Sequence, residues 1–117
     1  MSANINTDLG NIVIENNVIA HIAGISAMES YGIVGMASKN AADGLLQILK
    51  LDNLSKGIQV NSENGMINIT LHVVLEYGVR ISTVGNNIID RVKFNVENLT
   101  GLTVDKIEVL VEGIRTE

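Results

Sequence analysis

The sequence contains no cysteine, no proline and no tryptophan, and only 3% of its 117 residues are aromatic. The lack of cysteine excludes a disulfide framework, a thiolate nucleophile and any zinc or iron–sulfur site with cysteine ligands. The few aromatic rings leave little material for the stacking platforms that bind sugars, nucleotides and single-stranded nucleic acids. Basic residues are also in the minority, 8 against 13 acidic ones, and the net charge of −5 argues against binding nucleic acid by neutralising phosphates.

Long apolar runs are missing too, although apolar residues are plentiful. No stretch approaches the ~18 consecutive apolar residues of a transmembrane helix, and residues 1–4 lack the basic and apolar regions of a signal peptide. With 46% hydrophobic and 18% charged residues, the chain has enough apolar material for one core, and its length falls in the single-domain range of ~100–150 residues. We therefore expect one domain over residues 1–117, with its core at about 10–114, in a cytoplasmic protein.

The clearest pattern is the alternation of apolar and polar residues over 66–77, which predicts a long strand with one buried face. Val74 is an apolar exception on the polar side. Upstream, Ile58 and Val60 alternate with polar residues, and the intervening segment 62–65 has the composition of a turn. The two runs together predict a hairpin with Asn64-Gly65 near its tip.

Two helices are predicted from apolar residues spaced three or four apart. The later helix begins near Ser82 or Thr83, which can cap it, and ends before Gly101. Its stripe consists of Ile81, Val84, Ile88, Val92, Val96 and Leu99. The earlier helix has Asn16 or Asn17 as its cap and a stripe of Val18, Ile22 and Ile25.

Short strands are predicted on either side of these helices, at 12–14, 33–36 and 107–111. A further short helix is expected within 40–54. The resulting order, β-α-β-(α)-β-β-α-β, predicts an α+β fold. We expect a two-layer sandwich in which the helices pack on one face of a mixed sheet.

Residues that could carry out catalysis are few and scattered. His21 and His72 are the histidines of the chain, and neither belongs to a His-x-x-x-His spacing or a similar set of metal ligands. Three carboxylates, Glu76, Glu108 and Glu112, fall on polar positions of strands and are expected to be solvated. The sequence therefore predicts no catalytic residues, no metal and no cofactor.

One glycine pair offers a competing interpretation. Gly32-Ile33-Val34-Gly35 fits the Gly-x-x-Gly pattern of KH-type RNA-binding loops. The two central residues favour strands, and the nearest cation is Lys39, so a strand is the preferred interpretation.

Two surfaces are candidates for protein contacts. One is the segment 40–54, whose apolar side chains point in nearly every direction around a short helix: Leu45, Leu46, Ile48, Leu49, Leu51 and Leu54. Such a helix either tucks against the edge of the sheet or forms a docking surface for another chain or a second copy. The other candidate is the solvent-side face of the sheet, which bears His72, Val74 and Leu110.

Several segments, taken in order, resemble the bacterial alkaline shock protein family of envelope stress response proteins. They are 10–14, 18–24 and 31–36 in the first third of the chain, and 76–78, 96–102 and 109–113 in its closing half. Segments 31–39 and 54–60 are most similar to the YloU-like branch of Gram-positive bacteria. The resemblance covers about 10–114, and the family offers no agreed catalytic residues.

The resemblance implies a non-enzymatic interaction or scaffold protein in cell-envelope stress homeostasis. Some family members are tethered beneath the cytoplasmic membrane by a separate anchor protein, so we expect a protein partner and a location that is cytoplasmic or peripheral to the membrane. YloU-like members tend to be encoded beside a kinase-like protein of fatty-acid phosphorylation. The alternative is therefore a regulatory subunit or small-ligand binder of a lipid-metabolic enzyme, which requires a concave apolar pocket. A third possibility, an enzyme, requires His21 and His72 to meet carboxylates in one cleft.

Overall fold

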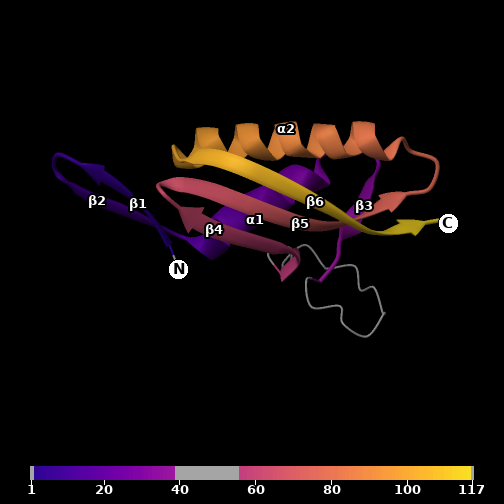
Figure 1. Ribbon diagram of the computed structural model, residues 1–117, viewed down its shortest axis with the longest axis horizontal. Coiled ribbons are helices and arrows are strands. Elements are labelled where there is room, and N and C mark those ends of the chain that lie inside the picture. Colours follow the sequence, from indigo (N-terminus) through magenta and orange to yellow (C-terminus); the bar gives the residue numbers. More distant parts are fainter. Residues whose placement is uncertain (1, 39–55, 117) are drawn as a thin grey trace.

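A computed structural model describes residues 2–38 and 56–116 of the chain (Figure 1). This part contains six strands and two helices in the order β1 (Ser2–Thr7), β2 (Gly10–Glu15), α1 (Asn16–Met28), β3 (Ile33–Met36), β4 (Ile58–Glu63), β5 (Met66–Glu76), α2 (Ile81–Thr100) and β6 (Thr103–Arg115). The predicted segment 40–54, with its helix and its leucines, lies outside the described residues.

Strand β5 is the centre of the main sheet. Along one edge it pairs antiparallel with β4 over 66–71 and with β3 over 73–75, so the two shorter strands lie end to end. Along its other edge it pairs in parallel with β6 over its whole length. The sheet is therefore mixed, and the predicted α+β fold is confirmed.

The predicted hairpin is confirmed as well. Asn64 and Gly65 join β4 to β5 with φ angles of 53° and 79°. Both residues are in the left-handed region that a two-residue type I′ turn requires, which explains the Asn-Gly pair.

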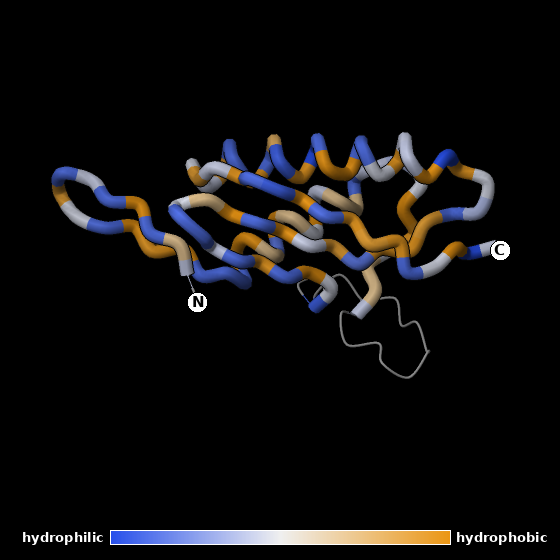
Figure 2. Tube along the Cα trace, in the orientation of Figure 1, coloured by the Kyte–Doolittle hydropathy of each residue, from blue (hydrophilic) through white to orange (hydrophobic). Residues whose placement is uncertain are grey.

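Both helices cover one face of the sheet, and β4, β5 and β6 leave the other face in view in Figure 1. The core lies between these layers. Alternate residues of β5, such as Ile69, Leu71 and Val73, are almost completely buried, as are Ile88 and Val92 of α2. Figure 2 shows hydrophobic residues on the side of α2 that faces the sheet and hydrophilic ones on its outer side.

The predicted stripe of α1 is wrong for Val18 and Ile25, although its remaining residue, Ile22, does pack against the core. The helix packs on the core with Ile19, Ala20, Ala23 and Ala27, while Val18 and Ile25 are 47% and 39% exposed. Because α1 is apolar almost all round, the 3.6-residue period does not single out one face. Alanines allow the helix to approach the sheet closely, so Ala20, Ala23 and Ala27 face inward together with Ile19, while Val18 and Ile25 face outward.

The predicted helix caps are also wrong, because both helices begin earlier than expected. Glu15 and Arg80 are the N-cap residues, and neither makes a side-chain capping hydrogen bond within the described structure. Asn16 instead donates from Nδ2 to the carbonyl oxygen of Val60, 3.1 Å away, which ties the start of α1 to β4. The predicted end of α2 is confirmed: Gly101 has φ 77° and donates its N–H to the carbonyl of Glu97.

Strand β1 is an element that the sequence patterns do not predict. It forms an antiparallel hairpin with β2, which contains the predicted strand at 12–14. This hairpin projects beyond the sheet at one end of the molecule, opposite the C-terminal end of β6 (Figure 1). Its base is anchored by Ala3, which is buried, and by Ile14, which packs against the core. No helix of the described residues is both long enough and apolar enough to cross a membrane.

Candidate interaction surfaces

A groove of about 500 Å³ runs between α1 and α2 on the side of the helix layer that faces away from the sheet. Its apolar lining comes from Ile22 and Ile25 of α1 and from Phe94 and Leu99 of α2. Phe94 and Leu99 are 65% and 73% exposed, an unusual state for side chains of this size. The polar lining residues are His21, Ser26, Glu29, Asn95 and Asn98. The groove is thus an apolar strip with polar rims, open to solvent.

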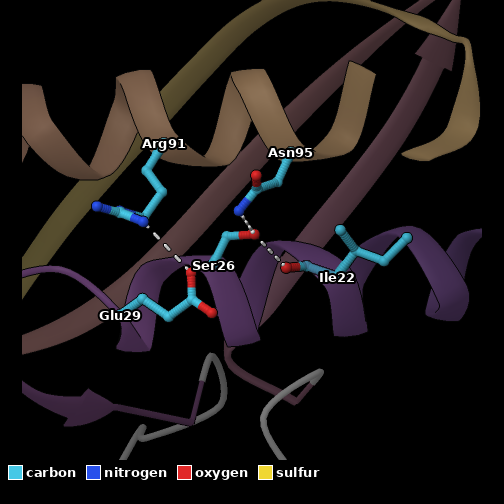
Figure 3. A network of polar contacts seen from close by, with 5 residues as sticks. All are labelled: Ile22, Ser26, Glu29, Arg91 and Asn95. Carbon is cyan, nitrogen blue, oxygen red and sulfur yellow. Dashed lines mark hydrogen bonds and ion pairs between the residues drawn. The ribbon is translucent and has the colours of Figure 1, made fainter. Parts of the chain in front are cut away.

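A short polar network holds the two helices antiparallel beneath this groove (Figure 3). Asn95 donates from Nδ2 to Ser26 Oγ over 2.9 Å, and the Ser26 hydroxyl donates to the carbonyl of Ile22 over 2.7 Å. Ser26 is only 2% exposed, so both roles of its hydroxyl are satisfied inside the protein. Arg91 and Glu29 form an exposed ion pair of 3.4 Å, which contributes little stability. The Ser26–Asn95 contact, together with the packing of both helices on the core, therefore helps to set the helix spacing and the width of the groove.

A double-mutant cycle of Ser26→Ala and Asn95→Ala is expected to show coupling of about 1 kcal/mol in the free energy of unfolding. Ser26→Ala leaves Asn95 Nδ2 without its acceptor, and Asn95→Ala removes the donor to Ser26 Oγ, which keeps its bond to Ile22. Since the contact is already lost after either change, the second change destabilises the protein less than it would alone. Urea denaturation of the four proteins measures this coupling. Additive effects of the two substitutions would show that the contact does not join the helices, and Arg91→Ala, with an expected effect below ~0.5 kcal/mol, serves as the exposed control.

A second concavity, the end pocket, lies where α2 begins and has a volume of about 400 Å³. Its lining residues are Tyr31, Glu76, Tyr77, Gly78, Val79, Arg80, Thr83, Val84 and Asn87. The two tyrosines are 81% and 72% exposed, so their rings form walls of the pocket that water can reach. The N–H of Tyr77 donates to the carbonyl of Arg115, which attaches the end of β6 to the pocket.

The face of the sheet predicted to make contacts is less accessible than expected. His72 and Leu110 are paired residues of β5 and β6 and lie side by side. His72 donates from Nδ1 to Glu112 Oε2 over 2.7 Å, and its side chain is 13% exposed. Val74 is only 5% exposed and offers little surface. A contact role for these three residues stays a prediction, as does that of Leu45, Leu46, Ile48, Leu49, Leu51 and Leu54, which lie outside the described residues.

The structure does not bring the two histidines together. His21 lines the helical groove, whereas His72 lies on the opposite face of the sheet. Among residues 2–38 and 56–116, no three His, Cys, Asp or Glu side chains gather in a way that could hold a metal ion. The Gly32–Gly35 segment is not a KH-type loop, because 33–36 form strand β3 and pair with β5.

Sequence patterns do not reveal the exposed apolar residues of the groove. The regular spacing of apolar residues along α2 predicts that Leu99 belongs to the buried stripe, but the buried stripe ends with Val96. Phe94 carries a usable signal, since it is the single phenylalanine of the chain and falls off the stripe. An aromatic residue on the outer side of an amphipathic helix favours an interaction surface.

The family model that matches the chain, over residues 4–116, is that of the alkaline shock protein 23 family, described as having a cell envelope-related function. The chain is 45% identical over 116 residues to the uncharacterized protein YloU of Bacillus subtilis strain 168, covering 98% of this chain and 97% of that protein. It is 44% identical to the uncharacterized protein Spy1614 of Streptococcus pyogenes serotype M6, covering 98% of this chain and 96% of that protein. The uncharacterized protein YqhY of Bacillus subtilis is 31% identical over 109 residues, which cover 93% of this chain and 80% of YqhY. No solved structure matches the chain. The resemblance stated from the sequence motifs is thereby confirmed.

Proposed function

Because the chain belongs to the alkaline shock protein 23 family, whose function is related to the cell envelope, we propose that it is a non-enzymatic interaction protein of cell-envelope stress homeostasis. We propose the groove between α1 and α2 as the site where its partner binds. The observation that carries this proposal is the exposure of Phe94 and Leu99 along an apolar groove whose spacing is set in part by buried hydrogen bonds.

The shape of the groove favours an amphipathic helix as the partner element. A groove between two antiparallel helices accepts a third helix that buries residues spaced three, four and seven apart. Burying Phe94 and Leu99 would contribute about 4 kcal/mol before the costs of association, because each side chain is already about one-third covered. These two residues would therefore be the anchors of the contact, and the polar rims would set its register.

The chemistry of the groove supports a binding role over a catalytic one. Its lining holds one histidine, His21, and one carboxylate, Glu29, which already faces Arg91. General acid–base catalysis requires two titratable groups in contrasting environments that converge on one substrate. The groove instead presents apolar side chains and amides.

The proposed partner is a protein of the cell envelope or of its lipid supply. A membrane-anchor protein would place this chain at the cytoplasmic side of the membrane, and a lipid-pathway kinase would make it a regulatory subunit. Both would offer a helix to the same groove, so one set of variants tests both.

Phe94→Asp and Leu99→Asp are expected to weaken the partner's binding by at least tenfold, because a carboxylate buried in the complex would lack a counter-charge. Asn86→Asp is the matched control, since it adds the same charge on an exposed position of α2 outside the groove. Affinity purification from lysate, with and without detergent, identifies partners that the first two variants lose and the control retains. The helical segment of such a partner is then titrated against each purified protein by calorimetry. Wild-type affinity in Phe94→Asp and Leu99→Asp would overturn the proposal.

The alternative, a small-ligand binder for a lipid-metabolic enzyme, is favoured by the same apolar lining and by a volume within the range of ligand sites. A fluorescent fatty acid distinguishes the two. Saturable binding that Leu99→Asp abolishes would establish the alternative. Absence of saturable binding, together with a helical partner that depends on Leu99, would leave the protein-binding function.

A further inference from the structure

The hairpin of β1 and β2 carries exposed aliphatic side chains on a rigid tip. Leu9, in the turn, is fully exposed, and Ile12 and Val13 of β2 are 50% and 54% exposed. The turn is held by Thr7, whose Oγ1 donates to the carbonyl of Gly10 (3.1 Å) and accepts from the N–H groups of Leu9 (3.3 Å) and Gly10 (3.1 Å). The backbone that carries Leu9 is thus held in one turn conformation, which lowers the part of the entropic cost of binding that comes from ordering this loop.

The end pocket lies at the opposite end of the molecule from this tip. The long axis of the described structure is 53 Å, with the hairpin at one end and the junction of β5, α2 and β6 at the other (Figure 1). One copy therefore cannot place its own Leu9 in its own pocket. The pocket offers Val79 and Val84 as apolar lining between Tyr31 and Tyr77, and its volume of about 400 Å³ exceeds what one leucine side chain needs.

The charges of the two ends are complementary. Residues 2–15 include the carboxylates of Asp8 and Glu15 and no lysine or arginine. Asp8 is exposed and adjacent to Leu9 in the turn. The pocket contributes the guanidinium of Arg80, and Arg115 follows at the neighbouring end of β6. Glu76 also lines the pocket and opposes this attraction in part, so apolar burial of Leu9 is the main contribution.

We propose that the hairpin tip of one copy, with Leu9 at its apex, docks in the end pocket of a second copy. The two surfaces differ and lie at opposite ends, so the contact is heterologous and joins copies head to tail. Because a head-to-tail dimer as a whole keeps one free tip and one free pocket, the assembly continues beyond a dimer unless it closes into a ring. The contact leaves the groove between α1 and α2 free, so self-association and partner binding are separate properties.

Two single variants test the proposal by sedimentation velocity over a concentration series. Leu9→Asp removes the apolar tip at a fully exposed position. Thr83→Glu narrows the pocket and repels Asp8, while a carboxylate in the first turn of α2 suits the helix dipole and preserves the fold. The wild type is expected to gain mass with concentration beyond that of a dimer, and both variants are expected to stay monomeric. Asp8→Asn is expected to shift the association midpoint several-fold upward in concentration.

Mixing the two variants gives the sharpest result. Leu9→Asp keeps an intact pocket and Thr83→Glu keeps an intact tip, so a 1:1 mixture is expected to form dimers and nothing larger. Both tyrosines of the chain line the pocket and there is no tryptophan, so a change in tyrosine emission on mixing reports that the pocket is filled. Leu99→Asp, in the helical groove, is expected to assemble like the wild type.

Three outcomes would overturn the proposal. They are a wild-type protein that remains monomeric up to ~1 mM, a Leu9→Asp variant that assembles like the wild type, and a mixture of the two variants that stays monomeric. None of them bears on partner binding in the groove, and loss of partner binding would leave the head-to-tail contact intact.

Discussion

Leu71→Ala is expected to lower the free energy of unfolding by about 3–5 kcal/mol, whereas Leu99→Ala is expected to change it by less than ~0.5 kcal/mol. Leu71 is completely buried in the middle of β5, where it pairs with Ile58 of β4 on one side and Val109 of β6 on the other. Truncation leaves a cavity between strands that are hydrogen-bonded on both edges, so the sheet cannot close around it. Leu99 is 73% exposed and leaves no cavity.

Urea denaturation, followed by circular dichroism, measures both variants. For Leu71→Ala the urea concentration at the midpoint of unfolding is expected to fall strongly, while the dependence of the unfolding free energy on urea concentration stays the same. For Leu99→Ala the midpoint is expected to stay unchanged. A large loss of stability in Leu99→Ala would show that this residue belongs to the core, which would remove the basis for the proposed partner site. The pair of leucines therefore separates residues that hold the fold from residues available for binding.

The elements predicted well from the sequence are those with one buried and one solvated face. In β5 the alternation of Ile67, Ile69 and Leu71 with polar residues leaves only one orientation, and in α2 the spacing of Val84, Ile88 and Val92 does the same. Strand β1 escapes prediction because Asn4 and Asn6 are poor strand formers and its apolar face contains only Ala3 and Ile5. Its pairing with β2, rather than its own composition, makes it a strand.

The groove could not be predicted because it is a property of two helices far apart in the sequence. Its spacing depends on the contact between Ser26 and Asn95, 69 residues apart, which no local pattern reveals. The orientation of α1 is decided by close packing of Ala23 and Ala27 against the core, and that packing turns Ile25 outward. Periodicity measures hydrophobicity, whereas the approach of a helix to a sheet also depends on side-chain size.

Gly32→Ala is expected to lower the free energy of unfolding by about 2–4 kcal/mol, through both backbone strain and a steric clash. Gly32 has φ +91°, and a Cβ there would lie 3.0 Å from Cγ2 of Val84 and 3.2 Å from Cγ1 of Val79. Its carbonyl also accepts the N–H of Glu76, at the end of β5, so a shift of this residue disturbs the sheet.

Gly78→Ala is the matched control, because Gly78 has a similar φ of +97° but no atom within 4 Å of the place where a Cβ would lie. Gly78→Ala is expected to lower the free energy of unfolding by about 1–2 kcal/mol, through backbone strain alone. The difference in unfolding free energy between the two variants therefore gives the cost of the clash with Val79 and Val84. Urea denaturation gives the stabilities, and tyrosine emission of the folded proteins reports on Tyr31 and Tyr77 beside these valines. Equal losses in the two variants would mean that the valines move aside freely. In that case the apolar lining of the end pocket would be deformable, and the pocket would adjust its shape as the Leu9 tip enters.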